Sequence, residues 1–543
     1  MYKASRRDFL KAAALATGAI GLGSALSGCS KSGGGGDITL KVAAEPYAPM
    51  PTAEEQKTSV TARAYADALQ EWLRKNPGVT LSKVNIDIWN QQAMVTAAAG
   101  GTAPAIYSGN ALGNFNQPAI LAAFKQGLAA DVTKLFNDSK LVDKLAPYVR
   151  PVWEGMWQVD GKYYGVPGGF GVSDGIFYRR DLLAQAGVPE PQPDWTWTDL
   201  RTMAKKLTAG KRKGFATPQW GLQVALDSDG FSLLTQLPAP KTTWRWDWNY
   251  DWNAQQQWIP AVENWRAMMF QDKSLLSDVS YGSWNEVTAA FVRGDAAMQA
   301  GNVALYVTPA DSDNSFLGLA KQVGKPVWDV VGWMTYPLGQ FGEYPARRSY
   351  VDSYSFSPDL NDDELDKAFS LWSYLSGPGL VRQKEFLYNE TKDLQRVYSS
   401  DTMMPVMADT SKSLPGSPEK AWGEQYVAQV RRAGSRPAMP ETSSYLPPDK
   451  AAGPTSQPVD DAMSKWMYEP GSPNVLDGLQ KLQSVRNKQA ESFSSSASEA
   501  DFLAGAKKYF QAQSDFWKAD APRFHDEVFS GFLDKYVHPA LGE

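Results

Sequence analysis

The sequence predicts an α/β protein that contains a parallel sheet and more than one hydrophobic core. Strand-like and helix-like patterns alternate between residues 38 and 110, as they do in parallel sheets with crossover helices. The chain has 543 residues, of which 43% are hydrophobic. That length exceeds what one core usually holds, so we expect at least two folded units.

The first strand and helix follow from periodicity. Ile38–Val42 alternates between apolar and polar residues, which predicts a short strand. The N-P-G sequence at 76–78 should end the helix that comes next. The apolar residues of that helix share one face: Ala62, Tyr65, Ala66, Leu69, Trp72 and Leu73.

Two further strands complete the predicted parallel unit. Val84, Ile86 and Ile88 alternate with polar residues and predict the second strand, a small-residue helix follows over 91–99, and 105–107 is a third short strand. Ligands of such sheets bind at the carboxyl ends of the strands. Those ends hold hydrogen-bonding and aromatic residues, although each would also serve as a turn or cap: Glu45, Tyr47, Trp89, Asn90 and Ser108–Asn110.

The middle of the chain carries a hairpin and a capped helix. Asp160–Gly161 predicts a tight turn between two strands. Thr198 is the expected N-cap of a helix over Asp199–Leu207. A later helix is predicted over Leu365–Ser376, where G-P-G ends it.

Four blocks in this order resemble a known family. They are G-K-Y-Y-G-V-P at 161–167, I-F-Y-R-R-D-L-L-A-Q-A-G at 176–187, W-T-W-T-D-L at 195–200 and A-F-V-R-G-D-A-A-M-Q-A-G-N at 290–302. The chain resembles the extracellular solute-binding proteins of carbohydrate ABC importers, the maltose-binding-protein-like class. It departs from the pattern at Arg179, where Asn is usual, and at Asn302–Val303, where the family often has Trp.

The resemblance implies a hinged, two-lobed periplasmic-binding-protein-like fold of type II. Lobe 1 would comprise 37–168 and 353–405, and lobe 2 would comprise 169–352 and 406–490. The chain would cross between them near 165–172 and 346–353. A sugar or oligosaccharide would bind in the cleft, and closure would present the complex to a membrane permease. This function requires no cofactor, no metal and no covalent chemistry.

The resemblance also implies a set of cleft residues, each of which could instead be a packing residue. Arg347 and Arg348 stand beside this set: in the cleft they would favour an acidic sugar, and otherwise they form surface ion pairs. Trp153 and Trp157 are further candidates before the first crossing. The expected ligand-binding residues are Glu45, Tyr47, Trp89, Asn110, Phe170, Asp174, Trp284, Asn302, Trp333, Tyr350 and Asp352.

The densest aromatic run is W-R-W-D-W-N-Y-D-W at 244–252. As a strand it would place its aromatic residues on one face, which would suit a sugar platform. The alternative is a hairpin of lobe 2 that lies away from the cleft. Ligand affinity that is unchanged by replacing Trp246 and Trp248 with Ala would exclude the platform.

The last part of the chain, residues 491–543, does not follow the family. Five Ser between 492 and 498 are typical of a linker. Two helices are predicted on either side of Pro522 and are expected to dock as a helical cap on one lobe. Their apolar faces comprise Phe502, Leu503, Ala506, Phe510 and Trp517, and then Phe524, Val528, Phe532, Leu533 and Tyr536.

The N-terminal region indicates export and lipidation. S-R-R-D-F-L-K at 5–11 matches a twin-arginine signal, and L-S-G-C at 26–29 matches a lipobox. We expect residues 1–28 to be a signal peptide, Cys29 to carry lipid and 29–36 to be a flexible tether. The alternative, a membrane-spanning helix, would need roughly 20 apolar residues. Cys29 is the only cysteine, so no intramolecular disulfide is possible.

Composition excludes several other classes. The net charge of −5 argues against nucleic acid as a partner, and a monomer is expected. The only two histidines, His525 and His538, lie in the C-terminal region, so the main body has no His-based triad or His-rich metal site. The rival function is an exported enzyme of the glycoside hydrolase type, because such an enzyme needs only two carboxylates.

Overall fold

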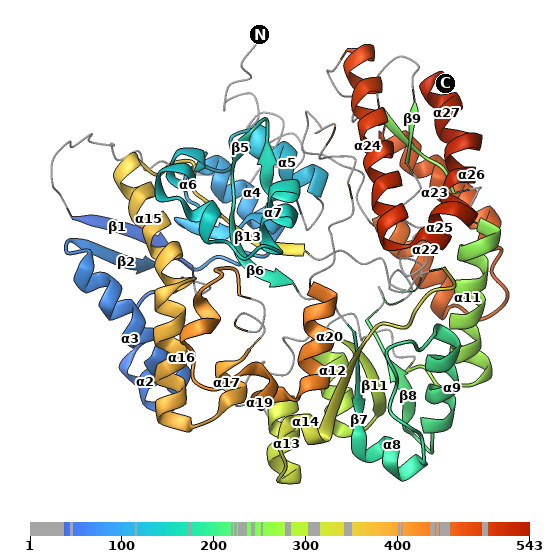
Figure 1. Cartoon of the computed structure of the whole chain (residues 1–543), viewed down its shortest axis with the longest axis horizontal. Helices are drawn as coiled ribbons and strands as arrows, with labels where there is room; N and C mark the ends of the chain where they lie inside the picture. Colours follow the sequence, from blue (N-terminus) through green and yellow to red (C-terminus); the bar gives the residue numbers. More distant parts are fainter. Residues whose placement is uncertain are drawn as a thin grey trace, which may run out of the picture.

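The computed structural model forms two α/β lobes and a helical C-terminal unit that stands above the second lobe (Figure 1). No helix among the described residues is both long enough and apolar enough to cross a membrane. The structure describes residues 37–43, 47–113, 117–171, 175–218, 221, 225, 236–239, 245–250, 254–276, 284–301, 315–341, 350–399, 402, 405–434, 440, 445, 457–490 and 498–543.

Lobe 1 contains two small sheets, one parallel and one antiparallel. β1 (Ile38–Val42) pairs in parallel with β2 (Val79–Lys83), as the prediction of a parallel unit requires. β3 (Ile106–Ser108) pairs antiparallel with β13 (Tyr350–Phe356), which in turn pairs antiparallel with β6 (Val166–Gly171). The amide of Ala105 donates to the carbonyl of Lys41, so the two sets of strands are adjacent.

The predicted second strand is displaced. We expected Val84, Ile86 and Ile88 to form it, but β2 ends at Lys83 and Ile88 lies in a turn. The amide of Val84 still donates to the carbonyl of Val42, where β1 ends. The alternating pattern at 84–88 therefore lies outside the strand, in irregular chain that leads into a turn.

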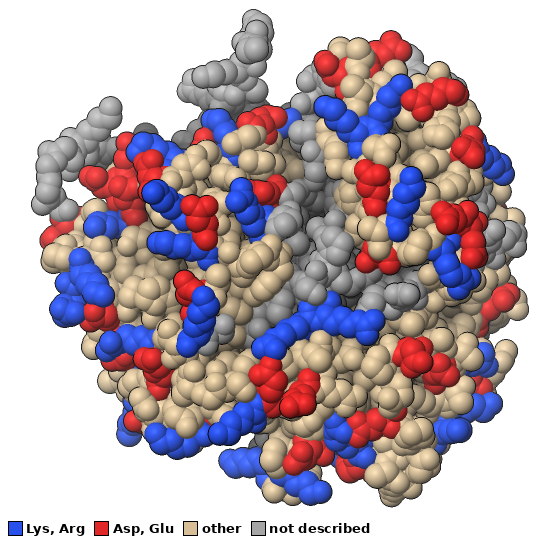
Figure 2. Space-filling view, viewed as in Figure 1, with Lys and Arg blue, Asp and Glu red and all other residues tan. Residues whose placement is uncertain are grey.

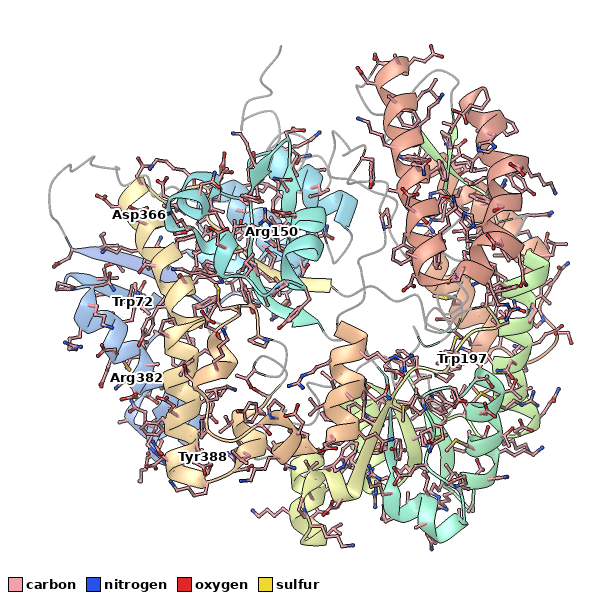
Figure 3. All side chains as sticks on the ribbon, in the orientation of Figure 1. Trp72, Arg150, Trp197, Asp366, Arg382 and Tyr388 are labelled. Carbon is pink, nitrogen blue, oxygen red and sulfur yellow. The ribbon has the colours of Figure 1, made fainter. Side chains whose placement is uncertain are left out.

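Helices cover the two sheets of lobe 1. One of them, α3 (Val60–Lys75), begins and ends close to its predicted limits, and Asn76 is its C-cap residue. α16 packs against α3, and Figure 3 shows Trp72 and Arg382 on this side of the lobe. The main helices are α2 (Ala53–Thr58), α3 (Val60–Lys75), α4 (Gln91–Gly100), α5 (Gln117–Lys125), α6 (Thr133–Ser139), α7 (Val149–Trp157), α15 (Asp362–Leu375), α16 (Pro378–Thr391), α17 (Leu394–Val397) and α19 (Pro418–Trp422).

The hairpin predicted at Asp160–Gly161 is confirmed. β4 (Gln158–Val159) pairs antiparallel with β5 (Lys162–Tyr163) across a two-residue turn. Both turn residues have positive φ, 52° for Asp160 and 76° for Gly161. Positive φ at both positions matches the right-handed twist of the flanking strands.

Lobe 2 is built on a four-stranded sheet with the order β12-β7-β11-β8. The strands are β7 (Gly175–Arg179), β8 (Lys213–Ala216), β11 (Ala296–Gly301) and β12 (Val331–Thr335). The helices include α8 (Arg180–Ala186), α9 (Trp197–Leu207), α11 (Ile259–Arg266), α12 (Trp284–Arg293), α13 (Phe316–Val323), α14 (Val327–Val330), α20 (Glu424–Gly434), α22 (Gln457–Tyr468) and α23 (Val475–Ala490).

The N-cap of α9 is Thr196, and the prediction of Thr198 is wrong. The hydroxyl of Thr196 accepts from the amide of Asp199, and the Asp199 carboxylate accepts from the backbone amide of Thr196 at 2.8 Å. This capping box needs an acidic residue three positions after the cap. Only Thr196 has that spacing to Asp199, so the helix starts at Trp197, two residues earlier than expected.

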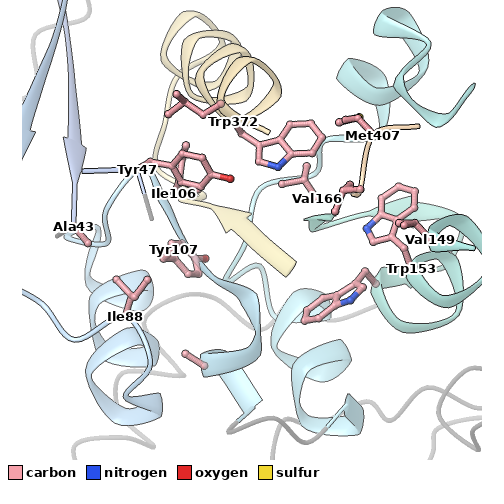
Figure 4. Packing of buried hydrophobic residues seen from close by; sticks show 14 of the residues in the cluster. Ala43, Tyr47, Ile88, Ile106, Tyr107, Val149, Trp153, Val166, Trp372 and Met407 are labelled. Atoms are coloured by element: carbon pink, nitrogen blue, oxygen red, sulfur yellow. The ribbon is translucent and has the colours of Figure 1, made fainter. Parts of the chain in front are cut away.

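Aromatic side chains dominate the core of lobe 1. Trp153 stacks on Tyr163 with ring centroids 4.5 Å apart, and Phe136 stacks on Trp153 at 4.7 Å. Figure 4 shows Trp153, Trp372 and Tyr47 projecting into one interior from different elements. A second core fills lobe 2, and a third lies within the C-terminal unit.

The C-terminal unit contains the two predicted helices. α24 (Glu499–Asp520) is followed after Ala521 by a helical run from Pro522 to Leu541, made of α25 (Pro522–Phe524), η8 (His525–Phe529), α26 (Ser530–Phe532), η9 (Leu533–Val537) and α27 (His538–Leu541). The core between them extends to Trp246 on β10 (Arg245–Trp248), which pairs with β9 (Gln236–Ala239). The unit therefore contacts the hairpin of the aromatic run.

Candidate ligand-binding site

Two neighbouring strands of lobe 1 lie where the chain passes between the sheets: β6 precedes β7 of the second sheet, and β13 follows β12 of that sheet. β6 and β13 pair antiparallel, with Tyr350 opposite Gly171 and Asp352 opposite Gly169. The register shifts between Asp352 and Ser353. β7, the central strand of the second sheet, begins at Gly175, four residues after β6 ends. The described residues of this two-stranded ribbon overlap the segments 165–172 and 346–353, and the crossings there stay a prediction.

Close packing surrounds this ribbon on the side of lobe 1. A Cβ added at Gly109 would lie 2.7 Å from the Ser355 hydroxyl and 3.0 Å from the Trp157 ring, which is too close for any larger residue. The Ser355 hydroxyl donates to the carbonyl of Tyr164 at 3.0 Å. The glycine therefore lets η1 (Gly109–Gly113) approach β13 closely.

Trp89 and Asn110 come from adjacent elements of lobe 1. Trp89 is 36% exposed, and its amide donates to the Asp87 carboxylate at 2.9 Å. Asn90 caps α4 by accepting from the amide of Ala93, and α4 packs against η1, which contains the buried Asn110. An aromatic face and an amide are both groups that sugars bind, but Asn110 is buried and only Trp89 offers an exposed ring.

Tyr47 and Trp333 are packing residues in this structure. Tyr47 is 6% exposed, meets Tyr354 edge-on at 5.3 Å and lies 3.4 Å from the Ser376 hydroxyl. Burial raises the pKa of the Tyr47 phenol, and Tyr354 raises it further, so the phenol stays neutral. Trp333 is 1% exposed and meets Tyr426 of α20 edge-on at 5.7 Å.

The other expected site residues are only partly described. Glu45, Asp174 and Asn302 lie outside the described residues, as do Arg347 and Arg348. For four more the structure gives the backbone position alone, on β6, at the start of α12 and on β13: Phe170, Trp284, Tyr350 and Asp352.

Trp153 and Trp157 belong to the core of lobe 1. Both are fully buried. The indole N–H of Trp153 donates to the carbonyl of Gly165 at 3.2 Å, and the ring of Trp157 lies 5.9 Å from that of Phe124. Their place before the first crossing therefore serves packing in this structure.

The aromatic run contacts helices rather than a free surface. Trp246 lies 5.5 Å from both Phe502 and Tyr509 of α24. The guanidinium of Arg486 on α23 lies 3.3 Å from the ring centroid of Trp248. Trp244 and Trp252 lie outside the described residues. A sugar platform on Trp246 and Trp248 would have to displace these contacts, so the structure favours the hairpin alternative.

Sequence reasoning missed two buried polar groups of lobe 2. Arg179 is 8% exposed, pairs with Asp181 at 2.7 Å and donates to the carbonyls of Phe291 and Val292, so it links β7 to the end of α12. Gln299 is fully buried on β11, where its amide donates to the Thr288 hydroxyl at 3.3 Å. Gln299 could have been recognised from the sequence, because it is a single amide side chain within an otherwise apolar strand.

His525 of the C-terminal unit has a packing role. Nε2 of His525 lies 3.0 Å from the Ser514 hydroxyl and its Nδ1 lies 2.8 Å from the Asp526 carboxylate. These distances resemble a catalytic triad, but both Ser514 and His525 are 7% exposed in the contact between α24 and η8. Among the described residues no group of three or more His, Cys, Asp or Glu side chains could hold a metal.

The visible surface carries interspersed charges of both signs (Figure 2). No face in this view is covered by a single sign of charge. This distribution agrees with the small net charge and differs from the basic stripe that nucleic-acid-binding proteins present.

Two α/β lobes joined by paired crossing strands define the class of hinged two-lobed binding proteins. The model of the bacterial extracellular solute-binding protein family matches residues 53–339, more than half of the chain. The protein therefore belongs to the family of bacterial extracellular solute-binding proteins. Because this is a family of binding proteins, the enzyme considered from the sequence has no support.

Curated relatives share shorter segments. The putative ABC transporter periplasmic-binding protein YcjN of Escherichia coli is 26% identical over 181 residues, which are 30% of this chain and 36% of the relative. The sn-glycerol-3-phosphate-binding periplasmic protein UgpB of Shigella dysenteriae is 30% identical over 23% of this chain and 27% of its own length. The chain thus spans about a third of these relatives.

Solved structures match over most of the chain. A solute-binding protein of Thermotoga lettingae bound with α-D-tagatose has a TM-score of 0.57 and 12% identity, covering 83% of this chain and 100% of its own. The GacH receptor of Streptomyces glaucescens, described unliganded and with acarbose, has a TM-score of 0.56 and 18% identity, covering 84% and 99%. At sequence identities this low, the similarity to these structures shows a shared fold only.

Proposed function

We propose that this chain is the ligand-binding component of an ABC importer that captures a sugar or oligosaccharide between its lobes and delivers it to a permease. The family match over residues 53–339 is the observation that carries the proposal. The named ligands of its structural neighbours, tagatose and acarbose, are both rich in hydroxyl groups. The relatives named for glycerol 3-phosphate add a phosphorylated polyol as a class to be tested.

The described geometry supports such a mechanism. The β6–β13 ribbon is the connection about which two lobes would hinge, and closure would exclude water from the ligand. Trp89 offers an exposed ring for the C–H face of a sugar, and polar groups such as Asn110 would pair with hydroxyls. Binding needs differential contact with the closed state and no chemical step.

The ligand class can be tested by thermal unfolding of the full chain with tagatose, maltose, raffinose, a uronic acid and glycerol 3-phosphate. A ligand that binds only the folded state raises Tm by mass action. A saturable rise with a neutral sugar supports the proposal. A rise with only the uronic acid or glycerol 3-phosphate would direct attention to Arg347 and Arg348, and no rise with any compound would contradict the proposal.

The role of Trp89 can be separated from a general effect of losing an exposed ring. Trp89→Ala should weaken binding of the identified sugar about tenfold, because a stacked aromatic face contributes roughly 0.5–1.5 kcal/mol. Phe270→Ala is the matched control, since Phe270 is 37% exposed on lobe 2 against 36% for Trp89. Equal affinities of the two variants, measured by calorimetry, would remove Trp89 from the site.

The proposal includes a lipid anchor on Cys29 and export by the twin-arginine pathway. The L-S-G-C sequence at 26–29 and the Arg6–Arg7 pair support it. Metabolic labelling with an alkyne fatty acid should mark the natural protein and not Cys29→Ser. Replacing Arg6 and Arg7 with Lys should retain the precursor in the cytoplasm; unchanged export would contradict the twin-arginine route.

A further inference from the structure

A pocket of about 390 Å³ opens on lobe 2 beside the N-terminal end of α9. Its size falls within the roughly 300–1,000 Å³ of small-molecule sites. Three segments line it: the first turn of α9, one face of the helical run that leads into α11, and the chain that leaves β12 at Leu338–Gln340. Figure 3 labels Trp197 at this end of the lobe, below the C-terminal helices.

Backbone pairing fixes the pocket. The amide of Leu338 donates to the carbonyl of Trp195 at 2.7 Å, and the indole of Trp195 donates to the carbonyl of Thr335 at 2.9 Å. The capping box of Thr196 then sets the direction of α9. The position of Trp197, the first residue of α9, is therefore fixed by these hydrogen bonds to the segment that follows β12 and by the helix cap.

The wall of the pocket is aromatic. Trp197 stacks on Tyr336 with centroids 6.2 Å apart and an interplanar angle of 22°. Trp265 of α11 lies 6.3 Å from Trp197 and is 1% exposed. The buried indole N–H of Trp265 has no acceptor within the described part of the chain, although such a donor normally has one.

The polar groups of the pocket are neutral. Besides backbone, they are hydroxyls and side-chain amides, including Thr198, Asn264 and Gln340. No Asp, Glu, Lys or Arg is among the described residues that line it. An adjoining groove on the other side of α11 differs, since Arg201, Glu263 and Arg266 line it. The first pocket is therefore suited to an uncharged ligand with hydroxyl groups.

We propose that this pocket is a second binding site, for a neutral sugar unit that stacks against Trp197 and pairs with Asn264 and Thr198. Stacking by aromatic rings together with amide and hydroxyl partners is the chemistry that recognises saccharides. The inference rests on the proposed sugar-binding function, because the unit would be either an outer residue of the cleft ligand or a separate sugar molecule.

The test blocks the pocket without touching the cleft. Ala261 lines the pocket on α11, so Ala261→Trp fills it. Glu263→Trp adds the same ring to the same helix but in the charged groove, and is the matched control. Asn264→Leu keeps the volume and removes the amide, which provides a second variant if Ala261→Trp does not fold. Unfolding curves establish that each full-length variant is folded.

Calorimetry with D-glucose, maltose, maltotriose and raffinose then measures affinity and stoichiometry. We expect Ala261→Trp and Asn264→Leu to abolish one of two binding events or to weaken binding of the longer sugars about tenfold, with Glu263→Trp unchanged. Loss of a separate event identifies an independent molecule, and selective weakening of longer sugars identifies an outer unit of the cleft ligand.

The contrary outcomes separate this inference from the proposed function. Binding that is lost in Trp89→Ala but equal in Ala261→Trp and Glu263→Trp would overturn the second site and leave the cleft function intact. The absence of binding by the natural chain to every sugar of the panel would overturn both. Binding that is sensitive to Ala261→Trp but not to Trp89→Ala would support the pocket and contradict the role of Trp89 in the cleft.

Discussion

The two lobes differ in whether the buried indole N–H groups of their tryptophans have hydrogen-bond acceptors. In lobe 1, Trp72, Trp153 and Trp372 donate to the Ser370 hydroxyl and to the carbonyls of Gly165 and Pro167, at 3.0–3.2 Å. In the described part of lobe 2, the indole N–H groups of Trp258, Trp265 and Trp333 have no acceptor, although Trp195 has one.

This difference concerns the stability of the two cores and not the exposure of the rings, since Trp265 and Trp333 are each 1% exposed. An unpaired buried donor costs about 1–3 kcal/mol. In lobe 1, Trp72, Trp153 and Trp372 do not incur that cost. In the described part of lobe 2, Trp265 and Trp333 are among the tryptophans that incur this free-energy cost. Trp265 lines the second pocket, and the ring of Trp333 lies against Gly175, where β7 begins. A high tryptophan content alone therefore does not identify a sugar platform.

The largest loss of stability should come from Trp153→Ala in the core of lobe 1. Removing a fully buried ring that stacks on Phe136 and Tyr163 should lower the free energy of unfolding by about 3–5 kcal/mol. Urea unfolding followed by circular dichroism measures it. A loss under about 1 kcal/mol would mean that the core of lobe 1 does not depend on this ring.

A smaller effect is expected at the ion pair of lobe 2. Asp272 is 4% exposed and accepts from Arg201 at 2.6 Å and from Lys205 at 3.1 Å. Asp272→Asn should cost about 1.5–3 kcal/mol at pH 7, the value of hydrogen bonds between charged groups. Denaturant titrations of the two proteins provide the comparison.

The same pair gives a pH dependence. The hydrogen bond from Arg201 holds the pKa of Asp272 below its ordinary value. A lowered folded-state pKa stabilises the fold above the unfolded-state pKa of about 4, and this stabilisation is lost as pH falls through the folded pKa. The stability difference between the natural chain and Asp272→Asn should therefore shrink below pH 4; a constant difference would contradict the pairing.

The difference in indole hydrogen bonding between the lobes can be tested directly by replacing one tryptophan in each lobe with phenylalanine. Trp153→Phe removes the hydrogen bond to the Gly165 carbonyl, whereas Trp265→Phe removes a donor that has no acceptor among the described residues. Trp153→Phe should cost about 1 kcal/mol more than Trp265→Phe in urea unfolding, each variant being the control for the other. Equal costs would mean that the lobes do not differ in this respect.

The smallest effect should follow Arg382→Ala. Arg382 links α16 to Asp67 of α3 at 2.9 Å, but its side chain is 45% exposed. Exposed pairs contribute about 0–1 kcal/mol, and less at high salt. A loss above 2 kcal/mol in thermal unfolding would show that the contact between these helices depends on charge rather than on apolar packing.

Local patterns allowed several elements to be predicted from the sequence. The limits of β1, the end of α3 at Asn76, the turn at Asp160–Gly161 and the two helices around Pro522 follow from periodicity and from turn and capping chemistry within about ten residues. The family blocks implied the two-lobed fold because their order reflects a whole topology rather than one element.

Tertiary structure decided which face each candidate side chain occupies. Tyr47 and Ser376 meet across 329 residues of sequence, and Trp246 contacts α24 some 260 residues later, so no local pattern could show that these rings are covered. β2 was misplaced because the alternating residues 84–88 lie outside the strand, which an alternating pattern alone does not show. Sequence determines local backbone preferences through neighbouring residues; burial is set by which distant surfaces meet, and that depends on the whole chain.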